Sequence, residues 1–83
     1  MRWTLVYTKR AARDLEALDV LTRKRIGARL LQLQDDPLGK SKKLTHPDIG
    51  SYRFRIGDYR VVFDLEGSKV VILRLGHRRE IYR

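Results

Sequence analysis

The sequence predicts a small α+β domain in which a helical hairpin packs on one face of a twisted antiparallel sheet. The last third of the chain alternates apolar and polar residues with the period of two expected of a half-buried strand. Residues 9–36 instead repeat their apolar positions every three or four residues, as amphipathic helices do. With 83 residues there is room for one modest core, so we expect a single domain over residues 1–83.

The first 36 residues predict one strand and two helices. A strand is expected at residues 3–7, followed by Thr8, whose hydroxyl can cap a helix beginning at the next residue. A second helix, capped by Asp19 or Thr22, ends before Pro37, because the residue preceding a proline is disfavoured in the helical conformation. The apolar stripes are Ala12, Leu15 and Leu18 in the first helix, and Ile26, Leu30 and Leu33, with Leu31 alongside, in the second.

Three further strands complete the expected order β-α-α-β-β-β. Residues 37–50 are rich in Gly, Pro and Lys and are expected to form a loop. The strands follow near residues 51–56, 59–65 and 69–75. The turn between the last two leaves two registers open. A two-residue turn would place Asp64 opposite Lys69, and a three-residue loop would bring Arg74 opposite Arg60.

The first hairpin contains an unfavourable pairing of charges. Gly57-Asp58 suits a two-residue type II′ turn, because Gly occupies the first central position. Arg55 then lies directly opposite Arg60, and like charges facing each other across two strands are destabilising. A local rule that is broken without a gain in stability points to a functional site. We therefore expect fixed positive charge arranged for an anionic ligand, although a single such arginine is more often a solvated residue of the sheet surface.

Composition narrows the class of partner. The 19 Lys and Arg against 10 Asp and Glu give a net charge of +9, above the roughly 2–8 typical of a small soluble domain. Such an excess favours nucleic acid, an acidic protein or an anionic membrane surface as partner. The absence of cysteine excludes disulfides and thiolate metal sites, and is compatible with the cytoplasm, where we expect the protein to act. No apolar run approaches the ~20 residues of a membrane span, and no metal-ligand cluster or phosphate-binding glycine loop occurs, so neither membrane nor cofactor is expected.

The order of these elements resembles the RelE/ParE superfamily of toxins from toxin–antitoxin operons. Two blocks carry the resemblance most specifically, YRFRIGDYRVVF at Tyr52 to Phe63 and GHRREIYR at Gly76 to Arg83. The chain is more similar to the RelE branch, whose members cleave messenger RNA in the ribosomal A site. The ParE branch shares the fold and poisons DNA gyrase instead. The resemblance implies a type II toxin that inhibits translation as an endoribonuclease (an mRNA interferase), without a metal ion or cofactor.

The resemblance also assigns roles to residues. It places Arg60, His77, Arg78 and Tyr82 at catalytic positions. Arg53 and Arg55 fall where the best-known members carry lysines. Because arginine does not lose its proton in proteins, these two can bind phosphate but cannot act as a base. The lysines of the preceding loop are expected to contact RNA phosphates without reading sequence: Lys40, Lys42 and Lys43.

Proton transfer is assigned to His77, because imidazole titrates near neutrality. Which residue is the general base and which the acid stays open. Tyr82 has several open roles: stacking on a base, hydrogen bonding to phosphate, shuttling a proton, or packing against the core.

The expected partners are the ribosome and its mRNA, and an acidic cognate antitoxin in a hetero-oligomeric complex. Two alternatives remain at this point: a non-enzymatic inhibitor of DNA gyrase, and an inactive RNA-binding relative.

Overall fold

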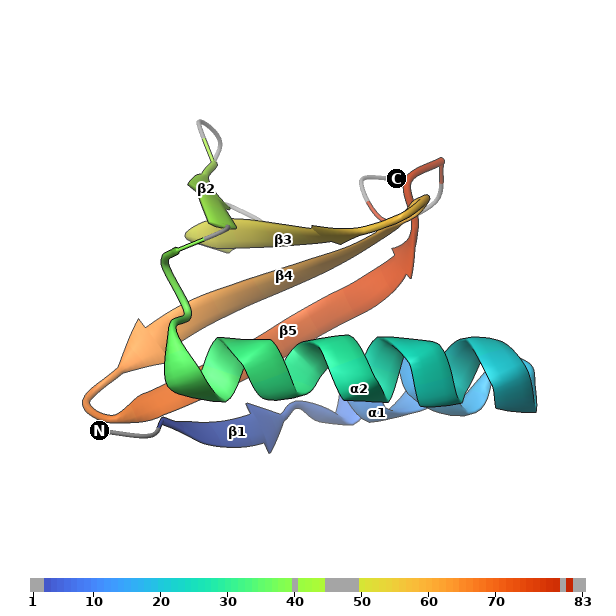
Figure 1. Ribbon diagram of the computed structural model, residues 1–83, viewed down its shortest axis with the longest axis horizontal. Helices are drawn as coiled ribbons and strands as arrows, with labels where there is room; N and C mark the ends of the chain where they lie inside the picture. The colour runs from blue at the N-terminus through green and yellow to red at the C-terminus, as the bar shows by residue number, and fades with distance from the viewer. Residues whose placement is uncertain (1–2, 40, 45–49, 80, 82–83) are drawn as a thin grey trace.

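Two helices lie against one face of a five-stranded sheet in the computed structural model, which describes residues 3–39, 41–44, 50–79 and 81 (Figure 1). In chain order the elements are β1 (Thr4–Tyr7), α1 (Lys9–Glu16), α2 (Val20–Asp35), β2 (Ser41–Lys43), β3 (Tyr52–Ile56), β4 (Tyr59–Glu66) and β5 (Lys69–His77). The strands are arranged in the order β1-β5-β4-β3-β2. The predicted α+β class and helical hairpin are confirmed.

The side chains that begin the two helices are those of Thr8 and Asp19. The Thr8 hydroxyl accepts a hydrogen bond from the backbone N–H of Ala11 at 3.1 Å. An Asp19 carboxylate oxygen accepts one from the Thr22 N–H at 3.1 Å, so Asp19 rather than Thr22 caps α2. Each cap satisfies a backbone donor that the first turn of a helix leaves free.

The core lies between α2 and the sheet. From α2 it takes the predicted residues Ile26, Leu30 and Leu33, whereas Leu31 is 54% exposed. The sheet contributes Phe54, Ile56, Val61, Phe63, Val70, Ile72 and Leu75, none more than 2% exposed. Burying apolar area of this kind is the main stabilising term of a small domain.

The sheet differs from the sequence-based prediction in two details. β1 pairs with β5 in parallel, so the sheet is mixed rather than purely antiparallel. β2 adds a strand to the segment predicted as a loop, pairing with β3 from Ser41↔Phe54 to Lys43↔Tyr52. The three residues Ser-Lys-Lys carry no apolar alternation, and their strand conformation depends on a partner remote in sequence.

The predicted first hairpin is confirmed residue by residue. Ile56 pairs with Tyr59 and Arg55 with Arg60. Gly57 has φ +58°, in the left-handed region that favours glycine.

The second hairpin has neither of the two predicted registers. Glu66 pairs with Lys69 around a Gly67-Ser68 turn, Asp64 lies opposite Val71, and Arg60 lies opposite Gly76. The register is shifted by an extra residue in β5: Phe63 pairs with Ile72 but Val62 pairs with Arg74, so Leu73 forms a β-bulge.

The face of the sheet away from the helices is partly covered by the segment preceding β3. The Ser51 N–H donates to an Asp64 carboxylate oxygen at 2.7 Å. A Cβ at Gly50 would lie 2.4 Å from Val62 Cγ1 and 2.8 Å from Leu73 Cδ1, so only glycine fits there. Val62 is therefore fully buried although it does not belong to the helix-side core. Of the described helices, neither is both long and apolar enough to cross a membrane.

Candidate functional site

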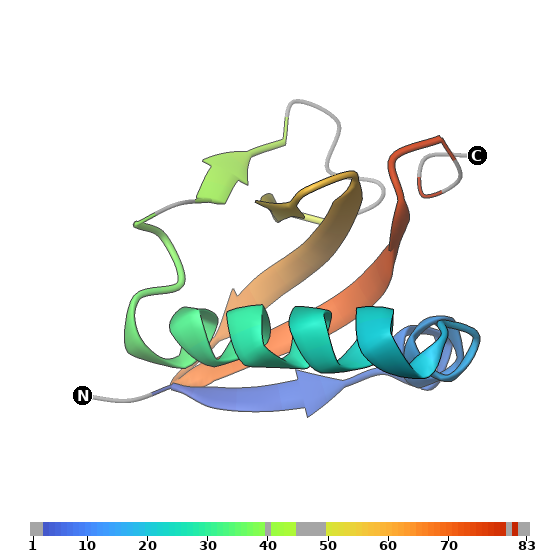
Figure 2. The ribbon, with the colours of Figure 1, turned by 45° about the vertical axis from the view of Figure 1, so that its right-hand side comes forward.

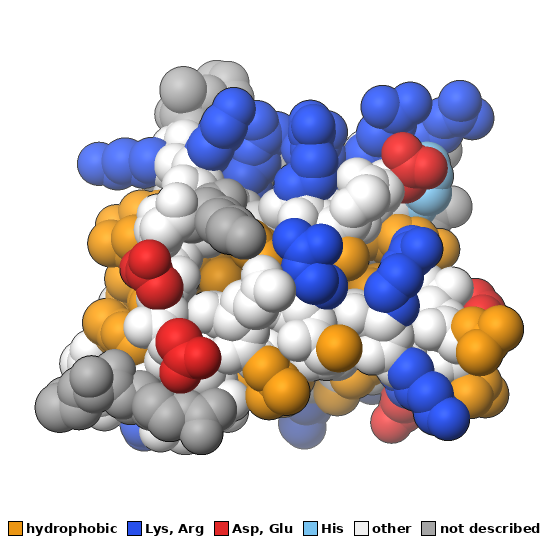
Figure 3. Space-filling model, in the orientation of Figure 1, with side chains coloured by type: hydrophobic (Ala, Val, Ile, Leu, Met, Phe, Trp, Pro, Cys, Tyr) orange, Lys and Arg blue, Asp and Glu red, His pale blue; other side chains and the backbone are white. Residues whose placement is uncertain are grey.

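Four of the predicted RNA-contacting or catalytic residues lie on the side of the sheet away from the helices. Lys42 of β2 lies opposite Arg53 of β3, and Arg55 of β3 lies opposite Arg60 of β4. We call these four residues the arginine face. Successive side chains of a strand point to opposite faces, and the intervening residues Phe54 and Val61 face the helices. Figure 3 shows Lys and Arg side chains gathered along the upper edge of the molecule, the side away from the helices.

The arginine face is a concentration of unneutralised positive charge. Among the described residues, none of its four cations forms a salt bridge with a carboxylate. Arg60 is half-buried, and its Nη1 atom is covered without a hydrogen-bond partner in the described part of the chain. A covered guanidinium N–H without a partner carries a desolvation cost of about 1–3 kcal/mol or more. The arginine face therefore carries positive charge that the described part of the chain does not neutralise.

Gly76 leaves the space opposite Arg60 open. It pairs with Arg60 in the β4–β5 ladder, and a Cβ built at Gly76 would meet no atom of the described residues within 4 Å. The row Arg55–Arg60–Gly76 therefore presents two guanidinium groups and then a gap. In the sequence Gly76 directly precedes His77 and lies within the continuation of the predicted last strand. A glycine inside a strand pattern is a recognised sign that another group approaches the backbone closely.

His77 lies on the other side of the sheet from Arg60. It pairs with Tyr59, whose ring packs against the core, and the two ring centroids are 5.7 Å apart in an edge-on arrangement. Its Nδ1 accepts a hydrogen bond from the Arg79 N–H at 3.2 Å. The imidazole lines a cavity of about 350 Å³ together with residues of α1, β4, β5 and the following turn, among them Asp14, Leu75 and Ile81. The structure thus does not bring His77 together with the arginine face, and the role predicted for it stays a prediction.

Arg78 is held where the tail meets the β3–β4 hairpin. Its backbone N–H donates to the Asp58 carbonyl at 2.8 Å, and its side chain is exposed. Figure 2 shows the segment after β5 rising beside the β3–β4 turn. The next turn of chain is closed by the Ile81 N–H, which donates to the His77 carbonyl at 3.1 Å. Arg78 therefore lies at the same end of the sheet as Arg55 and Arg60.

Three predicted site residues remain: Lys43, Lys40 and Tyr82. Lys43 lies opposite Tyr52, which packs on the helix side, so Lys43 does not share the face of Lys42. Lys40 and Tyr82 fall outside the described residues. Within the described residues no group of three or more His, Cys, Asp or Glu side chains could hold a metal ion. The chemistry available on the arginine face is the binding and electrostatic stabilisation of phosphate, for which planar guanidinium groups are suited.

Comparisons with known proteins place the chain among the toxins of type II toxin–antitoxin systems. The sequence matches the family described as "ParE toxin of type II toxin-antitoxin system, parDE" over residues 5–82. It is 37% identical over 90 aligned positions to toxin RelG of Mycobacterium tuberculosis, covering 100% of this chain and 99% of that protein.

Solved structures with the same fold include two toxin–antitoxin complexes. The fold matches that of the toxin–antitoxin complex RelBE2 from Mycobacterium tuberculosis with a TM-score of 0.84 and 30% identity, covering 94% of this chain and 100% of the matched one. The RelB–RelE antitoxin–toxin complex of Methanococcus jannaschii matches with a TM-score of 0.72 and 27% identity, covering 93% and 94% of the two chains.

Proposed function

Because this chain belongs to the RelE/ParE superfamily of type II toxins, we propose that it is a ribosome-dependent endoribonuclease that cleaves messenger RNA and so inhibits translation. The observation that carries the proposal is the Arg55–Arg60 cross-strand pair, in which Arg60 Nη1 has no partner among the described residues. Two like charges directly opposite each other lower the stability of the sheet. Binding of a phosphate between the two guanidinium groups would explain why both arginines are present.

The proposed reaction needs no metal ion. The ribose 2′-hydroxyl attacks the adjacent phosphorus, the bond to the 5′-oxygen breaks, and the products are a cyclic phosphate and a free 5′-hydroxyl. Arg55 and Arg60 stabilise the negative charge that accumulates on the phosphate oxygens, and Arg78 closes the site from the tail. By analogy with oxyanion-hole donors, each such contact is worth about 10²–10³-fold in rate.

The proton transfers need groups other than the arginines. A base must take the proton of the 2′-hydroxyl and an acid must supply one to the 5′-oxygen. In this proposal His77 and Tyr82 share these roles. For His77 this requires the substrate to reach around the end of β5, because its ring lies beside Tyr59 on the helix side.

The partner that restrains the toxin is proposed to be an acidic antitoxin. The two toxin–antitoxin complexes that this fold matches provide the precedent. The net charge of +9 provides the physical reason, since an acidic chain covering the arginine face would neutralise it and block access to RNA.

The test is primer extension on messenger RNA incubated with programmed ribosomes. The wild-type protein is expected to cut the message, and Arg78→Ala is expected to lower the rate about 10²–10³-fold. Arg79→Ala, at the neighbouring exposed arginine, is the matched control and is expected to cleave like wild type. Intact RNA at every codon with folded wild-type protein would contradict the proposal.

A second candidate is a non-enzymatic inhibitor of DNA gyrase. Two observations favour it: the matched family is described as a ParE toxin, and the structure separates His77 from the arginine face. A supercoiling assay distinguishes the two functions, because only the second predicts that the purified protein stops gyrase while leaving RNA uncut.

A further inference from the structure

The edge of β5 changes partner halfway along its length. β1 covers this edge as far as the pair Tyr7↔Ile72, and the Thr8 N–H then donates to the Ile72 carbonyl at 3.1 Å. Beyond this point no described strand lies on that side of β5. The helix α1 runs there instead, and its side chains bind the backbone groups that a strand would otherwise pair.

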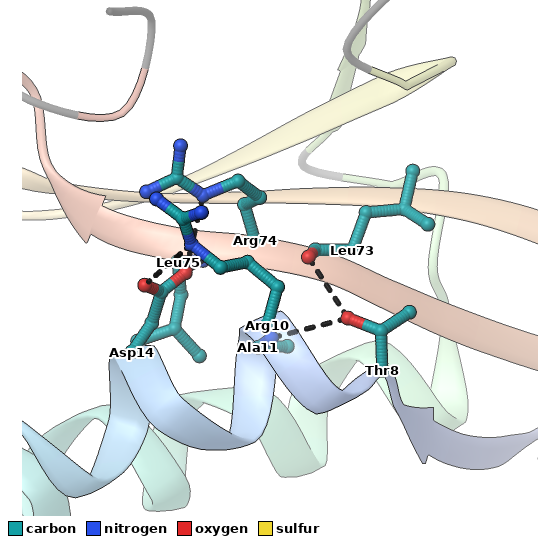
Figure 4. A network of polar contacts seen from close by, with 7 residues as sticks. All are labelled: Thr8, Arg10, Ala11, Asp14, Leu73, Arg74 and Leu75. Atoms are coloured by element: carbon teal, nitrogen blue, oxygen red, sulfur yellow. Dashed lines mark hydrogen bonds and ion pairs between the residues drawn. The ribbon is translucent and has the colours of Figure 1, made fainter.

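Two side chains hold the bulge of β5, one on each side of it: Thr8, the cap of α1, and Asp14 within α1 (Figure 4). The Thr8 hydroxyl donates to the carbonyl of the bulged residue Leu73 at 3.0 Å. Asp14 accepts from the Leu75 N–H at 3.1 Å and from Arg74 Nε at 3.3 Å, and Arg10 approaches its other oxygen at 3.6 Å. A backbone N–H or carbonyl that is covered without a hydrogen-bond partner costs free energy. Because Thr8 and Asp14 pair the Leu73 carbonyl and the Leu75 N–H, their hydrogen bonds favour the bulged conformation.

The bulge decides which side of the sheet the end of β5 presents. Val70 and Ile72 face the helices, and strict alternation from them would turn Gly76 toward the helices as well. The extra residue Leu73 shifts the alternation by one. Leu75 consequently enters the core, 1% exposed, and Gly76 comes to lie opposite Arg60.

We propose that Thr8 and Asp14 are positioning residues for the arginine face. By holding the bulge they set the register that leaves the gap of Gly76 opposite Arg60 and that brings Arg78 to its hydrogen bond with Asp58. Bulges commonly re-aim side chains next to active sites. Neither residue lies on the arginine face, although Asp14 also lines the cavity beside His77. The activity part of this inference rests on the proposed function.

The Thr8 hydroxyl forms two hydrogen bonds, and two substitutions distinguish the effect of one from that of the other. Thr8→Ser keeps both the cap to Ala11 and the donor to Leu73. Thr8→Asp keeps a side chain that caps α1 well but has no proton to donate to the Leu73 carbonyl. We expect Thr8→Ser to behave like wild type. We expect Thr8→Asp to lower kcat for cleavage at least 10-fold while KM for programmed ribosomes stays within about 2-fold, because small displacements of a reactive geometry act mainly on kcat.

Asp14 is tested in the same way. Asp14→Ala removes the acceptor for Leu75 and is expected to lower kcat to a similar degree, whereas Glu16→Ala, at an exposed position of the same helix, is expected to have no effect. Hydrogen exchange of the Leu75 amide, measured by NMR on the free protein, should accelerate in Asp14→Ala more than exchange in β3 does. This readout does not depend on catalysis.

The possible outcomes distinguish failure of the proposed function from failure of the positioning role. If the wild-type protein leaves RNA intact, the proposed function is wrong, and the exchange of Leu75 still decides whether Asp14 holds the bulge. Unchanged exchange at Leu75 in Asp14→Ala, or wild-type kcat in Thr8→Asp, would overturn the positioning role. A fall in kcat that Thr8→Ser shows equally, or that follows a uniform acceleration of exchange throughout the sheet, would also overturn it, because it would reflect general loss of stability.

Discussion

Two neighbouring rows of the sheet, one residue apart in each strand, have opposite character. The row Phe54–Val61–Leu75 faces the helices, and its residues are at most 2% exposed. The adjacent row Arg55–Arg60–Gly76 faces the other way, with two like charges opposite each other and then no side chain. The first row stabilises the fold by burial. The second lowers stability, which we interpret as the cost of holding a cationic surface in place.

The contrast explains how so small a domain can carry a cationic surface of this kind. Stability of a folded domain is a small difference between large terms, so a few unfavourable contacts are tolerated only if the remaining packing is good. Here the unfavourable charges are confined to one face, and the helix side supplies the apolar burial. Changes on the two faces should therefore move different measured quantities.

The largest expected effect on stability is that of Phe54→Ala. It removes a ring that is 2% exposed and lies 5.6 Å beneath the Arg29 guanidinium, and large-to-small core changes of this type cost about 3–5 kcal/mol. Urea denaturation followed by circular dichroism measures the free energy of unfolding. A loss below about 1 kcal/mol would mean that this row does not stabilise the fold as described.

A smaller effect is expected of Gly50→Ala, which tests the covered part of the outer face. The new Cβ would meet Val62 and Leu73, and overpacking of this kind costs about 1–3 kcal/mol. Gly67→Ala serves as a comparison in a turn where no atom of the described residues lies within 4 Å of the added atom, although its φ of +58° also disfavours a side chain. Equal losses at both positions would indicate that backbone conformation, rather than contact with Val62, makes glycine necessary at residue 50.

Arg55→Gln is expected to change stability in the opposite direction to Phe54→Ala. Removing one of two facing charges should raise the free energy of unfolding by about 0.2–1 kcal/mol, and less at high salt because the repulsion is screened. Denaturation at 0.05 M and 0.5 M NaCl checks this. A variant less stable than wild type at both salt concentrations would show that Arg55 makes a stabilising contact.

The smallest expected effect is a pH dependence at the α2 cap. Hydrogen bonds from the Thr22 side chain and backbone N–H hold the pKa of Asp19 below its ordinary value. A lowered folded-state pKa adds stability above the unfolded-state pKa, and that stability is lost as the pH falls through the folded value, below about pH 4. Asp19→Asn keeps the cap but does not titrate, so its Tm should fall less than that of wild type between pH 5 and pH 3. Parallel Tm curves would contradict this.

Much of the fold could be predicted because its signals are local. Thr8 as a cap, the stripe Ile26–Leu30–Leu33 and the turn at Gly57-Asp58 each depend on neighbouring residues only. The parallel pairing of β1 with β5 and the strand formed by Ser41–Lys43 depend on distant partners, and no local pattern encodes them.

The candidate site was predictable in part for the same reason. The pairing of Arg55 with Arg60 follows from a two-residue turn, and the structure confirms it. The position of His77 depends on the bulge at Leu73, which Thr8 and Asp14 stabilise through hydrogen bonds that span 65 and 61 residues of the sequence. Without that extra residue, alternation would have placed His77 with the arginines. The hydrogen bonds by which Thr8 and Asp14 hold the bulge could not be predicted either, because they join residues that are remote in the sequence.

The central claim is that the outer row is kept for function at the expense of stability, and Arg60→Gln tests it most directly. Cleavage of messenger RNA on programmed ribosomes and the free energy of unfolding are measured on the same preparation. We expect cleavage to fall about 10²–10³-fold while stability is unchanged or higher, because the variant loses a covered donor without a partner. Wild-type cleavage by Arg60→Gln, or a loss of cleavage that follows a loss of stability, would contradict the claim.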